Sequence, residues 1–290
     1  MSDPTAGAAA GAPPDGPSQL HLDPLPADDV LHLVHLGDPP ERRSVVRLDE
    51  ATAWADGRQG GGLLFGLADA GVGRSCVSAL RAGELVVTTS LHIGVRRQDW
   101  SPGDELGVVS APATRTPGGL VAAATFTLGD EEVGTAFGRF AVIGGASGDG
   151  VVAARADLGP SPAIERPPAG HLADLLQLGE AVVDGERLEL GFVASTGFAN
   201  ERMGVHGRVG ALVGHSATEV LLARLEPDAD VTTVEMHAQF LRPIPADGGP
   251  CRCVVEVRHR TRSVVATSAT LLTDDGRPAL VVDSGFAVAR

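Results

Sequence analysis

The stretch "GRVGALVGHSATEVLLARL" (207–225) predicts an apolar, glycine-containing helix in the second half of this 290-residue chain. A similar stretch, "GGLLFGLADAGVGRSCVSAL" (61–80), occupies the corresponding place in the first half. Glycine is unfavourable inside a helix. We therefore expect Gly66, Gly71 and Gly73 to serve the close approach of a sheet backbone. A helix that is apolar on most sides must be covered, and a curved antiparallel sheet can cover it.

The segments that follow each helix repeat in the same order. Rich in Val and Thr and partly alternating, they predict strands, and the Asp-Gly of "TDDG" indicates a hairpin turn. The alignment places Thr88 over Thr232 and His92 over His237. The matched segments are 85–97 with 230–242, 119–132 with 262–276, and 133–143 with 281–289.

This internal repeat predicts an α+β fold of two tandem domains, each a long helix wrapped by a curved antiparallel sheet. Pairing the two sheets edge to edge would remove two exposed edges. Stretches rich in Gly, Pro and Ala mark the ends of the domains. The expected division is a disordered tail at 1–27, an N-terminal domain at 28–145, a linker at 146–175 and a C-terminal domain at 176–290.

Composition narrows the class of protein. The formal net charge of −14 disfavours binding to nucleic acids and to anionic membrane surfaces. No apolar stretch is long enough to span a bilayer, and the first residues do not resemble a signal peptide. Cys76, Cys251 and Cys253 are too few for a zinc cage and are expected to be buried, reduced thiols. We expect a cytoplasmic protein without metal or cofactor.

Several motifs together resemble the hotdog-fold thioesterases of the phenylacetate-degradation type, here as a tandem or double hotdog. The motifs are "NERMGVHGR" (200–208), "VTTVEMHAQFLRPIP" (231–245), "SGFAV" (284–288), "GGGLLFGLADAG" (60–71) and "GRFAV" (138–142). The resemblance implies hydrolysis of an acyl-CoA or acyl-carrier thioester. It is also compatible with a homodimer of double hotdogs.

In the family, an asparagine lies six residues before the histidine of a His-Gly-Gly motif, and an acid lies nine residues after it. The second repeat keeps Asn200 and His206, but His215 stands where the acid is expected. The first repeat keeps the acid, Asp69, and lacks the asparagine and the histidine. Each repeat has therefore lost the part that the other has kept.

The resemblance implies that these losses are complementary, because hotdog sites lie at the interface of two domains. One site would join Asp69 to Asn200 and to the N–H of Gly207, and Thr88 on the following strand would orient the carboxylate or a water. Asp69 would act as nucleophile or as general base, and the N–H at the helix start would stabilise the carbonyl oxygen. His206 is expected at the same site, beside the substrate.

The opposite site would contain Trp54, Gly61 and His215, and would lack both acid and amide. Gly61 and Gly62 are predicted to contact substrate through the start of the first helix.

Other interpretations stay open at this point. Asp69 is also compatible with a structural ion pair, Asn200 with a loop cap, and Thr88 with an ordinary strand residue. The alternative function is a noncatalytic acyl-binding or assembly protein with a degenerate hotdog site. A hydratase or dehydratase would need a pair such as His215 with Asp69. Whether Asp69 and Asn200 converge distinguishes the enzyme from the other possibilities.

Overall fold

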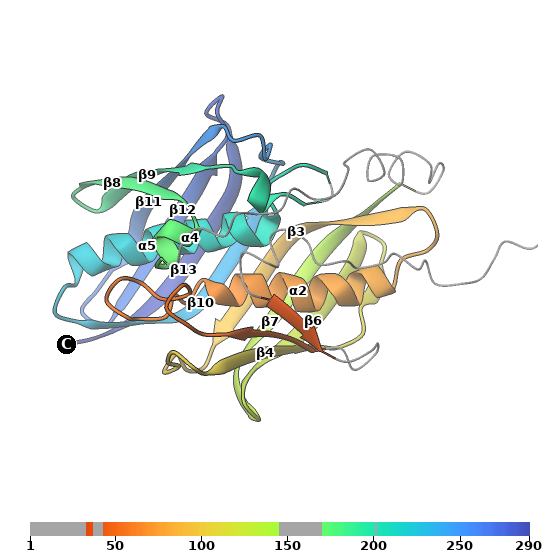
Figure 1. The fold of residues 1–290 in the computed structure, drawn as a ribbon, viewed down its shortest axis with the longest axis horizontal. Coiled ribbons are helices and arrows are strands. Elements are labelled where there is room, and N and C mark those ends of the chain that lie inside the picture. Colours follow the sequence, from red (N-terminus) through yellow and green to blue (C-terminus); the bar gives the residue numbers. More distant parts are fainter. Residues whose placement is uncertain (1–32, 37–42, 145–169, 201) are drawn as a thin grey trace, which may run out of the picture.

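A computed structural model describes residues 33–36, 43–144, 170–200 and 202–290. Within them, one antiparallel sheet of thirteen strands runs through both repeats (Figure 1). The predicted tail at 1–27 and residues 146–169 of the predicted linker lie outside the described residues.

The first repeat contributes seven strands and a long helix. These are β1 (Leu33–Leu36), β2 (Arg43–Arg47), α2 (Leu63–Ser78), β3 (Glu84–Val95), β4 (Glu105–Ser110), β5 (Thr114–Thr116), β6 (Gly119–Leu128) and β7 (Glu131–Gly144).

The second repeat has the same plan. Its elements are α4 (Leu172–Leu175), β8 (Leu178–Asp184), β9 (Arg187–Val193), the 3-10 turn η1 (Thr196–Phe198), α5 (Gly207–Leu225), β10 (Asp230–Phe240), β11 (Pro250–Arg260), β12 (Val264–Leu272) and β13 (Pro278–Ala289).

The order of strands shows the internal symmetry. The first repeat runs β1-β2-β4-β6-β7-β3, and the second continues as β10-β13-β12-β11-β9-β8. The repeats join where β3 pairs with β10, with His92 opposite His237. The predicted edge-to-edge pairing is thus confirmed. The repeat did not predict the hairpin before each helix or the strands β4 and β11, because recognisable similarity is confined to the helix and to β3, β6 and β7 with their counterparts β10, β12 and β13.

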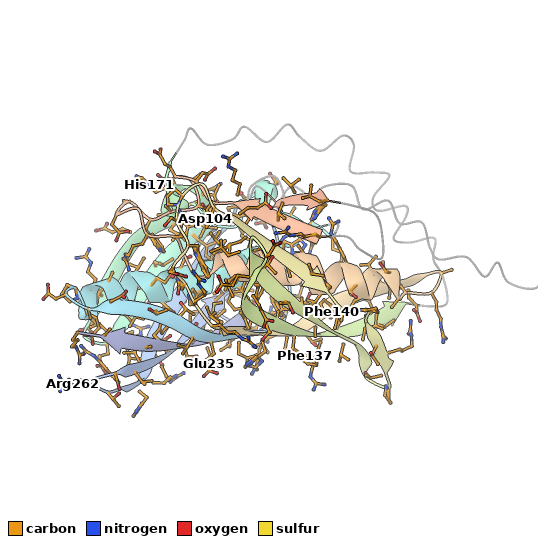
Figure 2. The ribbon with its side chains drawn as sticks, turned by 90° about the horizontal axis from the view of Figure 1, so that it is seen from below. Asp104, Phe137, Phe140, His171, Glu235 and Arg262 are labelled. Atoms are coloured by element: carbon orange, nitrogen blue, oxygen red, sulfur yellow. The ribbon has the colours of Figure 1, made fainter. Side chains whose placement is uncertain are left out.

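Both long helices lie on one face of the sheet and run antiparallel, with their N-terminal ends side by side (Figures 1 and 2). Strand side chains alternate between the two faces. Phe140 accordingly lies buried beneath the helices, whereas Phe137, three positions away, lies on the outer face and is 38% exposed (Figure 2). The N-terminal end of each helix therefore lies beside the other helix.

The strand pairing corrects one position in the alignment of the two repeats. The pairing register shifts between Thr88 and Ser90 in β3, and between Thr233 and Glu235 in β10, so both strands carry a β-bulge at the same place. Thr88 lies opposite Phe140, and Thr233 lies opposite Phe286. Thr88 therefore corresponds to Thr233, and the sequence alignment with Thr232 is wrong by one residue. The match of His92 with His237 already requires this, because each threonine lies four residues before its histidine.

Two glycines of α2 have different surroundings. A Cβ on Gly71 would lie 2.9 Å from atoms of Val108 and Ser110, so β4 packs closely there. A Cβ on Gly73 would have Phe140 as its nearest neighbour, 4.0 Å away. The expected close approach of the sheet backbone is wrong at both positions, because side chains of β4 pack against Gly71 and no atom approaches Gly73 closely.

The end of the predicted linker is part of the folded structure. Leu172 in α4 is fully buried, and its N–H donates to the carbonyl of Ala53. All three cysteines are free and buried, as expected. Across the described part of the chain, none of the helices has the length and apolar character needed to cross a membrane.

Candidate functional site

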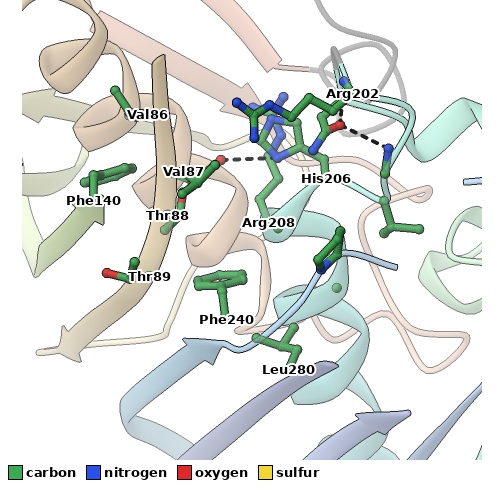
Figure 3. A pocket seen from close by; sticks show the side chains of 18 of the residues that line it. Val86, Val87, Thr88, Thr89, Phe140, Arg202, His206, Arg208, Phe240 and Leu280 are labelled. Atoms are coloured by element: carbon green, nitrogen blue, oxygen red, sulfur yellow. Dashed lines mark hydrogen bonds and ion pairs between the residues drawn. The ribbon is translucent and has the colours of Figure 1, made fainter. Parts of the chain in front are cut away.

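A cavity of about 690 Å³ lies between the two repeats (Figure 3). This volume is in the range of small-molecule sites. One wall comes from α2, β3 and β7, and the other from Asn200, Arg202, residues 204–208, Gly210, residues 240–244 and residues 279–280. Five residues of the predicted site line it together, namely Asp69, Thr88, Asn200, His206 and Gly207.

Asp69 is held by residues from both repeats. The Thr88 hydroxyl donates a hydrogen bond of 3.0 Å to Asp69 Oδ1. His206 Nδ1 lies 3.3 Å from Asp69 Oδ2 (Figure 3). A carboxylate that is 6% exposed needs such partners, because burial of an isolated charge is unfavourable. The contact between His206 and Asp69 was not predicted from the sequence. It could have been, because His206 directly precedes the helix whose start was predicted to face Asp69.

The start of α5 faces this carboxylate. His206 is the N-cap, and Gly207 is the first helical residue. The first N–H groups of a helix lack intrahelical acceptors and carry partial positive charge. A Cβ on Gly207 would lie 2.8 Å from the ring of Phe240, so a larger residue at the helix start would require this ring to shift. The cavity thus combines a carboxylate with a helix N-terminus across the repeat interface.

Asn200 organises the loop before α5. Its side-chain oxygen accepts the N–H groups of Arg202 and Gly204 at 2.9 and 3.1 Å. These two bonds use the oxygen and not the carboxamide nitrogen. The loop-capping interpretation of Asn200 therefore describes its side-chain oxygen, and the residue also lines the cavity.

The opposite site is closed by a residue that the sequence analysis did not consider. Glu219 accepts the indole N–H of Trp54 at 3.0 Å and the N–H of Gly61 at 2.8 Å. Its Oε1 also lies 3.6 Å from His215 Nε2. Trp54, Gly61 and His215 do come together as predicted, but the expectation that this site lacks an acid is wrong. Glu219 lies one helical turn after His215, which is outside the family spacing.

Gly61 and Gly62 do not line the cavity, so the structure does not support their predicted contact with substrate there. A Cβ on Gly61 would lie 2.8 Å from Thr233 Oγ1. A Cβ on Gly62 would lie 2.7 Å from Leu212 Cδ1. Packed side chains leave no room even for a methyl group at the start of α2.

His215 is a buried structural histidine. Its Nδ1 lies 2.9 Å from Ser284 Oγ, and its Nε2 lies 3.2 Å from Thr233 Oγ1. The ring stacks on Phe286 at a centroid distance of 5.5 Å. Both ring nitrogens thus face hydroxyl groups, whereas Asp69 pairs with Thr88 and His206. The two residues do not form the pair that a dehydratase would require.

The lining of the cavity carries more positive than negative charge. Asp69 is its one carboxylate within the described part of the chain, while four arginines contribute, namely Arg74, Arg202, Arg208 and Arg242. Arg202 and Arg208 are labelled in Figure 3. A positive patch on a chain with a net charge of −14 indicates an anionic ligand.

Cys76 lies on α2 and is a poor candidate for the nucleophile. Burial, reinforced by the charge of Asp69, raises the pKa of its thiol to about 12. Such a thiol is protonated at neutral pH, and only the thiolate attacks. Among the residues that the structure describes, no three His, Cys, Asp or Glu side chains cluster so as to hold a metal ion.

Comparison with known families and structures agrees with this fold. A profile described as "Acyl-CoA thioesterase N-terminal domain" matches residues 202–287, within the second repeat. A search of curated proteins gave no match. The TesB protein of Mycobacterium avium subspecies paratuberculosis superposes with a TM-score of 0.63 at 14% identity, covering 91% of this chain and 100% of that one.

Two further structures superpose over nearly the whole chain. A hotdog-fold protein of unknown function from Alicyclobacillus acidocaldarius has a TM-score of 0.60 and 12% identity, with coverage of 91% and 97%. The acyl-CoA thioesterase II TesB2 of Mycobacterium marinum has a TM-score of 0.55 and 14% identity, with coverage of 90% and 96%. At these identities the likeness establishes the tandem hotdog fold.

Proposed function

We propose that this chain, a tandem hotdog protein of the thioesterase superfamily, hydrolyses acyl-CoA at one site between its repeats. The observation that supports the site is the convergence of Asp69 from the first repeat with the start of α5 from the second. The equivalent place in the other half is filled by Glu219. The proposal therefore assigns one working site to each chain.

The proposed chemistry uses two groups that face the cavity, the start of α5 and the Asp69 carboxylate. Attack on a thioester places negative charge on the carbonyl oxygen, and the Gly207 N–H at the start of α5 stabilises that charge. Asp69 either takes a proton from the attacking water or attacks the carbonyl carbon itself. Thr88 and His206 hold the carboxylate in one orientation. On the first route the proton that Asp69 takes from water passes to the leaving thiolate, and the acyl group leaves as a carboxylic acid. On the second route the thiolate leaves as the Asp69 carboxylate forms a mixed anhydride with the acyl group, and water then hydrolyses this anhydride to release the carboxylic acid and restore Asp69.

The direct test is release of free thiol from a panel of acyl-CoA substrates of increasing chain length. We expect hydrolysis of at least one class with normal saturation. A chain that binds S-alkyl-CoA thioethers but releases no thiol from any substrate would instead be an acyl-binding protein, and the proposed function would be wrong.

Asn200 separates a loop function from a donor function. Asn200→Asp keeps an oxygen for the N–H groups of Arg202 and Gly204, and it removes the NH₂ donor. We expect kcat to fall by roughly 10²- to 10³-fold, because a lost donor to developing charge has effects of this order. Thermal unfolding should change little. If Asn200→Asp has full activity while Asn200→Ala unfolds easily, the residue serves only the loop.

The arginines of the cavity favour a polyanionic carrier. Arg202 and Arg242 are exposed at its rim, and guanidinium groups bind phosphate through paired hydrogen bonds. Coenzyme A carries several phosphate charges, whereas a thioester of N-acetylcysteamine carries none. The carrier is therefore the part of the substrate that these arginines would recognise.

Replacing both Arg202 and Arg242 by Ala tests this assignment. We expect kcat/KM for acyl-CoA to fall by about tenfold or more, mainly through KM, since exposed charge pairs contribute modestly. The same acyl group on N-acetylcysteamine should be hydrolysed equally by both proteins. An equal loss on both substrates would mean that the arginines act on the reaction centre or on folding, and not on the carrier.

A further inference from the structure

The two long helices carry residues at equivalent positions that differ in an informative way. Asp69 in α2 bonds Thr88, and His215 in α5 contacts Thr233. Because Thr88 and Thr233 are equivalent in the sheet, Asp69 and His215 are equivalent in the helices. One turn further along, four residues on, α2 has Gly73 and α5 has Glu219.

Glu219 shows what a long side chain does at this position. It crosses to the other repeat and bonds the N–H of Gly61, just before α2. A helix start of this kind is where the carbonyl oxygen of a thioester would bind. The carboxylate of Glu219 therefore occupies the place of a substrate in the closed half.

Gly73 leaves the equivalent place empty in the other half. It lines the cavity, and the nearest atom to a Cβ built on it is 4.0 Å away. A glycine inside a helix is unfavourable unless packing or function requires it. No neighbour lies closer than 4.0 Å to this Cβ, so close packing does not explain the glycine, and the open space beside it offers the functional reason.

The empty space continues along the face of α2. Asp69, Ala70, Gly73 and Val77 all line the cavity and share one helical face. From Asp69 to Val77 the helix rises about 12 Å. The facing wall comes from β3 and β7 and is largely apolar, with Val86, Phe140 and Ile143 among its residues. A channel of this shape, with the carboxylate at one end, suits a hydrocarbon chain.

We infer that the acyl chain lies along α2, between this helix and strands β3 and β7, and that Gly73 is the residue that admits it. The inference rests on the proposed thioesterase function and adds a determinant of substrate length. The channel is formed by elements of the first repeat alone.

Substitution at Gly73 tests the inference with a graded series. Gly73→Ala should leave the whole substrate profile within about threefold of wild type, because a methyl group fits the space. Gly73→Leu should lower kcat/KM for long acyl-CoA substrates by roughly 10- to 100-fold relative to the shortest substrate hydrolysed, as expected for a blocked apolar pocket. Gly73→Glu should lower hydrolysis of every substrate, because its carboxylate can reach the start of α5.

The matched control is Ser78→Leu, which adds the same side chain to an exposed position of the same helix. Circular dichroism and thermal unfolding establish that each variant is folded. An unchanged length profile in folded Gly73→Leu would overturn the inference, even if the wild type is a thioesterase. If the wild type hydrolyses nothing, isothermal titration with short and long S-alkyl-CoA thioethers separates the two claims. Weaker binding of only the long thioether by Gly73→Leu would support the channel; equal binding by both proteins would refute it.

Discussion

Asp69→Asn is expected to lower kcat for acyl-CoA hydrolysis by about 10²- to 10⁴-fold, the range for loss of a positioned base. The substitution preserves size and keeps an oxygen that can accept the Thr88 hydroxyl. It removes the group that takes a proton or attacks the carbonyl carbon. The measurement is steady-state thiol release at neutral pH, together with the Kd for an S-alkyl-CoA thioether.

The expected pattern is a large change in kcat with little change in the Kd of the thioether. His215→Ala is the matched control, because His215 is the equivalent residue of the other helix. It contacts Ser284 and Thr233 in a buried network and does not face the cavity. This control should retain most of the activity per folded molecule and should unfold at a lower temperature. Full activity in Asp69→Asn would contradict the mechanism, and a selective loss in His215→Ala would move the site to the other half.

Much of this site could be predicted from the sequence, because the second repeat keeps the family's spacing of asparagine and histidine and the first repeat keeps its acid. Asn200 and His206 kept their separation, and Asp69 kept its place in a helix that clearly matches the other helix. The fold followed from the repeat, since each apolar helix required a sheet to cover it. Asp69 and Asn200 line one cavity, which agrees with the prediction that the two residues share a site.

Two features that sequence reasoning missed depend on geometry that spacing does not contain. The alignment of Thr88 with Thr232 is not one of them, because the match of His92 with His237 already places Thr88 over Thr233. Glu219 lies outside the family motif, and its role arises only because α5 runs antiparallel to α2. Gly73 was assigned to close packing, because a sequence cannot distinguish a glycine that touches a neighbour from one that faces a cavity.

Glu219→Ala is expected to destabilise the protein by about 2–5 kcal/mol, because it leaves buried donors without their acceptor. The indole of Trp54 and the N–H of Gly61 both donate to this carboxylate, whose side chain is 12% exposed. Both donors come from the first repeat and the carboxylate from the second, so the substitution removes hydrogen bonds that hold the two repeats together. For a chain of this size the midpoint of thermal unfolding should fall by roughly 5–15 °C.

Glu219→Gln provides the control, since its amide oxygen retains one acceptor of nearly the same shape. It should destabilise the protein by about 1 kcal/mol, the usual contribution of a single hydrogen bond. Urea unfolding followed by circular dichroism gives both values, and thiol release by the folded fraction gives the activity. Because the carboxylate closes the other half, activity per folded molecule should persist in both variants. If Glu219→Ala abolishes hydrolysis while remaining folded and as stable as the wild type, the reacting acid is Glu219, and the assignment of the open and closed halves is reversed.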